Sequence, residues 1–146
     1  MALITADRWA ACAGGVPSPH ARSVEEQMSY DIRLVDPITR ETLQTDRDHQ
    51  LRGGTYAMGG TDEAWLNITC NYSPHFRRVL DENQGIRVLY GKTALESLPL
   101  LASAVQQLGD DVSSDYWAPT EGNARKALLD LMQLAIWLPH GVWDGD

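Results

Sequence analysis

The clearest alternation of hydrophobic and polar positions lies between Ala64 and Tyr72. Side chains that alternate with a period of two point to opposite faces of a β-strand. One face carries Trp65, Asn67, Thr69 and Asn71, and the other carries Leu66, Ile68, Cys70 and Tyr72. The segment therefore predicts a strand with one apolar face, around which we expect the rest of the chain to be arranged.

Residues 30–35 alternate in the same way, with Tyr30, Ile32 and Leu34 against Asp31, Arg33 and Val35. This pattern predicts a half-buried strand, which ends in a turn at Asp36-Pro37. Residues 41–44 are interpreted as the return arm of a short hairpin.

Two glycine pairs, Gly53-Gly54 and Gly59-Gly60, frame a brief strand over residues 55–58. We interpret the pairs as tight turns and place a hairpin turn at Thr61-Asp62. Together the segments predict an antiparallel sheet of about three or four strands.

The second half of the chain has helical spacing. Ser73 as N-cap and Pro74 at the first helical position predict a short helix. Residues 86–90 fit either a strand or a bridge to the next helix. Thr93 and Glu96 form a capping box, which predicts the start of a longer helix.

Two apolar stripes define the longer helices. The first runs from the capping box through Pro99 to Gly109, with Leu95, Leu98, Leu101 or Ala102, Val105 and Leu108. The second runs from about Thr120 to Leu138, with Ala124, Ala127, Leu128, Leu131, Leu134, Ala135 and Leu138. Both stripes need an apolar surface, which the sheet provides. The predicted fold class is α+β, a small antiparallel sheet covered on one face by two C-terminal helices.

The length of 146 residues fits one domain, which we place at residues 29–146. Residues 1–28 lack a clear pattern and contain a Gly-Pro-Ser cluster, so they are interpreted as an N-terminal extension. The net charge of -8 argues against general binding of nucleic acid. An acidic chain can still contain a local cationic pocket, or it can imitate nucleic acid.

Cys12 and Cys70 lie far apart in the sequence and are interpreted as free thiols. The N-terminus lacks a secretory signal pattern, and no apolar run reaches the length of a membrane span. The sequence therefore predicts an intracellular protein that does not contact membranes.

The four histidines lack metal-ligand spacing, and no serine lies in a nucleophile elbow. We predict no catalytic residue, no metal ligand and no cofactor. The candidate ligand-binding residues are Arg52, Gly53, Gly54, Thr55, Tyr56, Trp65, Asn67, Thr69, Asn71, Trp117, Thr120, Gly122 and Asn123.

Each part of this set also has a structural interpretation. The glycine pairs are explained by tight turns, and Arg52 by a surface salt bridge. Thr120–Asn123 could bind an anion at a helix start, or Thr120 could simply cap that helix. The rings of Trp65, Tyr116, Trp117 and Trp143 could stack on a ligand or pack at the edge of the core.

Several strings resemble a family of small, mostly uncharacterised proteins encoded by tailed bacteriophages. They are residues 52–56, 65–69 with Asn71-Tyr72, 90–93, 117–124 and 141–146. The resemblance covers roughly Tyr30 to Asp146, although Cys70 stands where an aromatic residue is expected. It implies an accessory protein that acts in the cytoplasm of the infected bacterial host, and it carries over no catalytic residues.

These observations lead to three functional hypotheses. The first is a non-enzymatic counter-defence protein that binds and sequesters a nucleotide-derived immune signal of the host. The second is an acidic inhibitor that binds a host nuclease or CRISPR protein by imitating nucleic acid. The third is a small enzyme that processes a nucleotide. The expected partner is thus a small anionic nucleotide or a host defence protein, and the chain is compatible with a homo-oligomer.

Overall fold

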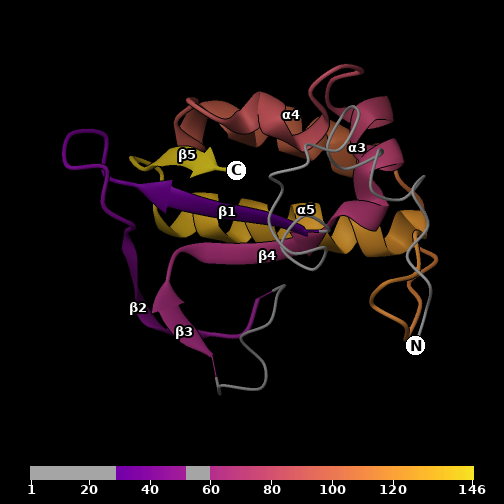
Figure 1. Ribbon diagram of the computed structural model, residues 1–146, viewed down its shortest axis with the longest axis horizontal. Helices are drawn as coiled ribbons and strands as arrows, with labels where there is room; N and C mark the ends of the chain where they lie inside the picture. Colours follow the sequence, from indigo (N-terminus) through magenta and orange to yellow (C-terminus); the bar gives the residue numbers. More distant parts are fainter. Residues whose placement is uncertain (1–28, 52–59) are drawn as a thin grey trace, which may run out of the picture.

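The computed structural model describes residues 29–51 and 60–146 of the chain (Figure 1). Three strands form the larger antiparallel sheet, in the order β4-β1-β5. Its centre is β1, Ser29–Val35, which pairs with β4, Trp65–Thr69, on one side and with β5, Val142–Gly145, on the other. The first and last parts of the described chain therefore lie side by side.

A smaller sheet consists of β2, Gln44–His49, and β3, Thr61–Glu63. In the part of the chain that the structure describes, backbone hydrogen bonds join it to the larger sheet at one corner. Leu43 N donates to Leu34 O, Leu34 N to Ala64 O, and Ala64 N to Leu43 O, each at 2.9 Å. Ala64 lies between β3 and β4, so this corner fixes the angle between the two sheets.

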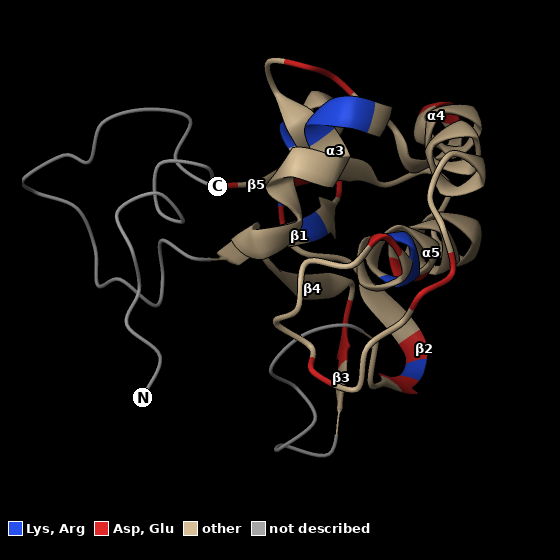
Figure 2. Ribbon diagram, turned by 90° about the vertical axis from the view of Figure 1, so that its right-hand side faces the viewer, with Lys and Arg blue, Asp and Glu red and all other residues tan. Residues whose placement is uncertain are grey.

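The helical elements follow β4 in the chain. A 3-10 turn, η2 at Cys70–Tyr72, leads into α3 at Ser73–Val79, and a second one, η3, covers Gly85–Leu89. The longer helices are α4, Ala94–Gln106, and α5, Glu121–Trp137. Figure 2 shows the larger sheet with α4 and α5 together on one side of it.

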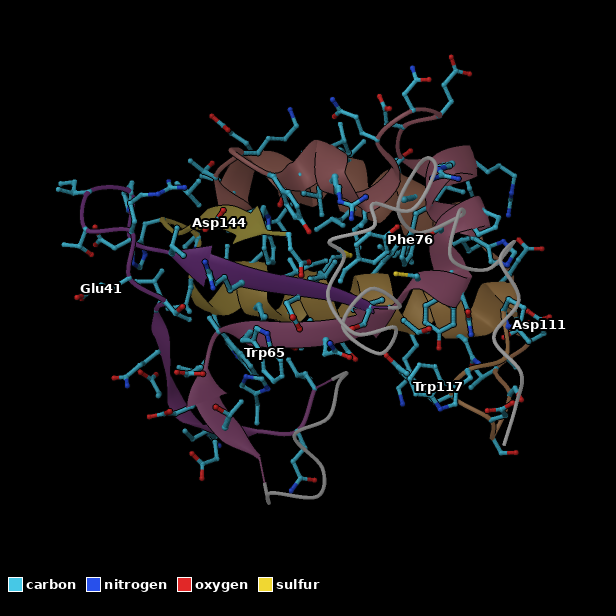
Figure 3. All side chains as sticks on the ribbon, in the orientation of Figure 1. Glu41, Trp65, Phe76, Asp111, Trp117 and Asp144 are labelled. Atoms are coloured by element: carbon cyan, nitrogen blue, oxygen red, sulfur yellow. The ribbon has the colours of Figure 1, made fainter. Side chains whose placement is uncertain are left out.

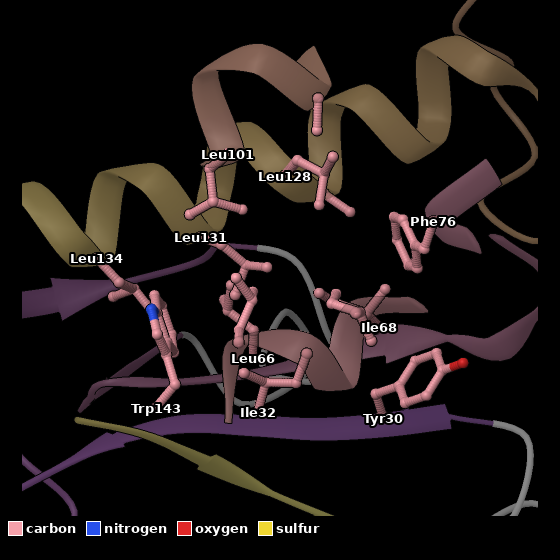
Figure 4. Close-up of a cluster of buried hydrophobic side chains, with 14 of the residues drawn as sticks. Tyr30, Ile32, Leu66, Ile68, Phe76, Leu101, Leu128, Leu131, Leu134 and Trp143 are labelled. Carbon is pink, nitrogen blue, oxygen red and sulfur yellow. The ribbon is translucent and has the colours of Figure 1, made fainter. Parts of the chain in front are cut away.

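One hydrophobic cluster fills the space between the strands and the helices. Figure 4 shows Leu101, Leu128 and Leu131 facing the sheet. From the strands, Ile32, Leu66 and Ile68 meet them, and all six side chains are fully buried. The predicted α+β class with a small antiparallel sheet is confirmed. The chain differs from the prediction in having two small sheets, whereas the short helix predicted at Ser73-Pro74 is present as α3.

The alternation in residues 64–72 predicted the buried face of β4 correctly, but the strand ends earlier than expected. After Thr69 the chain enters η2, where the Thr69 hydroxyl accepts a hydrogen bond from Asn71 N. Cys70 is disulfide-bonded, so the prediction of a free thiol is wrong for this residue. Cys12 lies outside the described residues.

Three predicted boundaries are wrong because tertiary contacts outweigh the local pattern. Residues 61–63 form a strand where we expected a hairpin turn, and the arm placed at 41–44 begins as β2 only at Gln44. Tyr72, not Ser73, is the N-cap of α3. For residues 86–90 two interpretations were open, and the 3-10 helix at 85–89 supports the bridge to the next helix over the strand. The brief strand predicted at 55–58 lies outside the described residues.

The capping box of Thr93 and Glu96 is present, and α4 passes through Pro99. Leu95 is 62% exposed, so its place in the buried stripe was wrong, and Leu98 is partly buried. Of the two interpretations of Trp143, packing in the core is the one that the structure supports: its ring is fully buried, because β5 places it between the sheet and α4. The described residues thus contain a C-terminal strand that the sequence patterns did not indicate.

Candidate functional site

The predicted site residues fall into three groups. Arg52, Gly53, Gly54, Thr55 and Tyr56 lie outside the described residues, so the part of the prediction that rests on them stays a prediction. Asn67, Thr69, Asn71, Trp117, Thr120, Gly122 and Asn123 belong to one connected region around the loop between α4 and α5. Trp65 lies at the other end of β4 (Figure 3).

The loop between α4 and α5 closes the outer edge of β4 through Tyr116. The Tyr116 hydroxyl accepts a hydrogen bond from Thr69 N at 3.0 Å and donates one to Asn67 O at 3.1 Å. Both backbone groups point away from β1, where an edge strand leaves its hydrogen bonds unmade. A side chain therefore takes the place of a neighbouring strand.

Further hydrogen bonds hold the same loop against η2. Asn71 Nδ2 donates to Trp117 O at 2.8 Å, and the Tyr72 hydroxyl donates to Tyr116 O. The rings of Tyr116 and Trp117 meet edge to face with their centroids 5.1 Å apart. Trp117 keeps half of its surface exposed. Its ring is thus held from behind and is accessible from solvent.

The start of α5 is occupied by groups of the protein itself. Thr120 caps the helix by accepting a hydrogen bond from Asn123 N, and Asp111 Oδ1 accepts one from Gly122 N at 2.9 Å. The loop lies so close that a Cβ at Gly122 would be 2.4 Å from Val112 N. An Asp111 carboxylate therefore occupies the position where we expected an external anion, in accordance with the preference of helix N-termini for negative charge.

The buried side chain of Asn123 completes this region. Its Nδ2 donates to Asp115 O and Ala118 O, both at 3.0 Å, and its Oδ1 accepts from Ser113 N at 3.0 Å. All three bonds go to the backbone of the loop. The polar groups of this region are thus largely used to fix the loop on the helix and the sheet edge.

A different group of side chains lies on the face of the larger sheet opposite α4 and α5. Arg33 of β1 is directly opposite Trp65 of β4 and directly opposite Asp144 of β5, so the three form one row across the sheet. Arg33 and Trp65 form a non-hydrogen-bonded pair, the type in which side chains come closest. Figure 3 shows Trp65 and Asp144 on either side of β1.

Asp144 lies between two guanidinium groups. Its Oδ2 is 3.1 Å from Arg33 Nη2, and its Oδ1 is 4.0 Å from Arg40 Nη2. These side chains are between 31% and 54% exposed, so solvent and ligands can reach them. Next to this row, Asn67 Nδ2 donates to Asp31 Oδ1 at 2.8 Å and to Ser29 Oγ at 2.9 Å.

This sheet face combines a half-buried indole ring, two guanidinium groups and an amide. An indole can stack on a base, and guanidinium groups bind phosphate through paired hydrogen bonds. Residue-by-residue reasoning from the sequence found Trp65 and Asn67 but missed Arg33, Arg40 and Asp144. The alternation of residues 30–35 could have indicated Arg33, because it already placed that side chain on the polar face.

The smaller sheet carries a concentration of acidic side chains. Asp46 and Asp48 on β2 and Asp62 and Glu63 on β3 are all exposed, and Figure 2 shows their red segments at one end of the protein. A small hollow next to them is lined by Thr45, Asp46, Arg47, Trp137 and Leu138. In the described ranges no group of three or more acidic, His or Cys side chains is arranged to hold a metal ion.

Comparison with models of known protein families, with curated proteins and with solved structures finds no match to this chain. The resemblance to phage accessory proteins therefore stays a prediction. In residues 29–51 and 60–146, no helix has the length and apolar character needed to cross a bilayer.

Proposed function

We propose that the protein is a non-enzymatic phage counter-defence protein that binds and sequesters a nucleotide-derived immune signal in the cytoplasm of the infected host. The observation that carries the proposal is the row in which Arg33 lies directly opposite Trp65 on the face of the sheet opposite α4 and α5. An aromatic ring beside a guanidinium group matches the two parts of a nucleotide, a flat base and an anionic phosphate.

Two further points support a binding role. Trp65 is half-buried, so part of its ring is held by the protein and part is accessible to a ligand. The resemblance in residues 52–56, 65–69 and 117–124 supports the phage context and the site of action.

The test combines recovery of the ligand with two tryptophan variants. The purified protein is incubated with a nucleotide extract of infected cells, washed and heated, and the released small molecules are identified by mass spectrometry. A sequestering protein releases its ligand unchanged, whereas an enzyme releases a product. Release of no nucleotide would contradict the proposal.

Trp65→Ala should weaken binding by about tenfold or more, because stacking on one ring contributes roughly 1–3 kcal/mol per base. Trp117→Ala is the matched control, since it removes a ring of the same type that is half exposed but lies at the other end of β4. An equal loss of binding affinity in both variants would contradict a site at the Arg33–Trp65 row.

The acidic surface of β2 and β3 favours a second candidate, an inhibitor of a host nuclease or CRISPR protein that imitates nucleic acid. Asp46, Asp48, Asp62 and Glu63 would stand in for phosphates towards a basic partner. The variant Asp46→Asn/Asp48→Asn should then weaken capture of a basic host protein strongly, and high salt should do the same. If the double variant keeps full counter-defence activity, this candidate is wrong.

A further inference from the structure

Asp144 is a negatively charged group held where two arginines converge. One carboxylate oxygen is 3.1 Å from Arg33 Nη2 and the other is 4.0 Å from Arg40 Nη2, so the carboxylate bridges two strands and a turn. All three side chains are partly exposed. Ion pairs at such positions contribute little free energy, so a ligand can replace the carboxylate at small cost.

Arg40 reaches this position from an unusual backbone conformation. Its φ is 63°, and it is the one residue other than glycine with positive φ among residues 29–51 and 60–146. The left-handed region is unfavourable for side chains with a Cβ, and glycine or asparagine usually occupies it. The cost of this conformation makes the guanidinium group of Arg40 a candidate for a functional role.

The turn that holds Arg40 is strongly fixed from its other end. Asp36 N donates to Glu41 O and Arg40 N donates to Asp36 O, both at 2.9 Å. The Asp36 carboxylate also accepts hydrogen bonds from Ile38 N and Thr39 N. These bonds lower the pKa of Asp36, first through Thr39 and then through Ile38. Because the turn is built without the Arg40 side chain, a change at this side chain should leave the turn intact.

We propose that Arg33 and Arg40 form the phosphate subsite of the nucleotide-binding face, and that Asp144 occupies this subsite until the phosphate of the ligand displaces it. The inference rests on the proposed function and names its ligand chemistry, a nucleotide with a phosphate monoester or diester. A phosphate group has two or more anionic or acceptor oxygens and can bridge both guanidinium groups as the carboxylate does. The base then lies towards Trp65, on the other side of Arg33.

This arrangement predicts opposite effects for neighbouring substitutions. Asp144→Asn removes the internal competitor and should tighten nucleotide binding by about threefold to tenfold. Arg40→Gly removes one half of the subsite and should weaken binding by about tenfold. Because glycine suits a φ of 63°, the thermal midpoint of Arg40→Gly should stay at or above that of the wild type.

The experiment is isothermal titration calorimetry of the full chain at low salt with three probes, AMP, cyclic AMP and cyclic di-AMP. Each variant is also melted. Arg78→Gln is the matched control, because it removes the same charge from an exposed ion pair, with Glu121, at a distance from the row. Its affinity should equal that of the wild type. If Arg40→Gly does not fold, Arg40→Asn replaces it, since asparagine also tolerates positive φ.

The outcomes separate the two proposals. Tighter binding by Asp144→Asn together with weaker binding by Arg40→Gly supports the subsite. Binding by the wild type with unchanged affinity in both variants overturns the subsite and leaves the proposed function standing. If none of the three probes gives a heat of binding with the wild type or with Asp144→Asn, the subsite is overturned. The proposed function is overturned separately if the protein also releases no nucleotide after incubation with the cell extract.

Discussion

The indole Nε1 of Trp143 donates a hydrogen bond to Ser97 Oγ, 2.8 Å away, and both side chains are fully buried. Ser97 Oγ in turn donates to Ala94 O at 2.7 Å, so the hydroxyl is used in both directions. This contact joins β5 to the first turns of α4. It also gives the polar N–H group of the buried indole ring a hydrogen-bond acceptor.

Ser97→Ala should destabilise the protein by about 1–3 kcal/mol, because it leaves the buried indole N–H without an acceptor. Urea unfolding followed by tryptophan fluorescence measures the change. Ser103→Ala is the control, since Ser103 lies in the same helix with an exposed side chain and should have a much smaller effect. A destabilisation no larger than that of the control would contradict the importance of this bond.

Leu131→Ala should lower the free energy of unfolding by about 2–5 kcal/mol, the usual cost of emptying a fully packed leucine position. Leu129→Ala makes the same chemical change in the same helix, at a side chain that is 38% exposed. Chemical denaturation of both variants gives the comparison. Similar losses would mean that the face of α5 towards the sheet has been assigned incorrectly.

The α5 helix could be predicted because its signals are local. Its apolar stripe repeats over more than four turns, and Thr120 lies directly before it as a cap. The strand at residues 65–69 was predictable for the same reason, since its alternation is long enough to be distinguished from chance.

The β5 strand could not be predicted because its cause is distant in the sequence. It has four residues, and it exists because Leu34 and Val35 of β1 pair with Trp143 and Val142. A four-residue strand next to a terminus gives no periodic signal of its own. The same limitation hid Asp144, whose role beside Arg33 depends on this pairing.

The candidate site was predicted in part. The polar face of β4 indicated Trp65 and Asn67 correctly as a surface pair, because alternation determines which side chains share a face. The start of α5 was predicted as an anion position, and an anionic group does lie there, but it is Asp111 of the same chain. The position of the Asp111 carboxylate depends on the path of the loop between α4 and α5, and no local sequence pattern specifies that path.

The partly buried phenol of Tyr90 should make stability depend on pH in the alkaline range. Burial, and then the Asp146 carboxylate, raise the pKa of Tyr90 above its ordinary value near 10. A group with a raised pKa contributes its full stability below the pKa of the unfolded chain and loses it as the pH rises towards the folded pKa. The contribution is thus intact at pH 9 and decreases above pH 10.

The comparison is between the wild type and Tyr90→Phe, measured by urea unfolding at pH 9, 10 and 11. Above pH 10 the wild type should lose up to about 1.4 kcal/mol per pH unit more than the variant, the slope for one proton. Parallel loss in both proteins would show that Tyr90 titrates normally in the folded state.

Tyr116→Phe tests whether one hydroxyl closes the outer edge of β4. The substitution keeps the ring and removes the oxygen that accepts from Thr69 N and donates to Asn67 O. Hydrogen exchange of the Thr69 amide should become about 2- to 10-fold faster, which corresponds to a net hydrogen bond of roughly 0.5–1.5 kcal/mol. Two-dimensional NMR in deuterated buffer resolves this amide from its neighbours.

The Ile68 amide is the internal reference in that experiment. Tyr116 bonds to the outward groups of Asn67 and Thr69, so the backbone groups of Ile68 point the other way, towards its partner Tyr30 in β1. Its exchange should stay unchanged. Equal acceleration at Ile68 and Thr69 would mean that the variant loosens the whole sheet, and the specific role of the Tyr116 hydroxyl at the edge would be wrong.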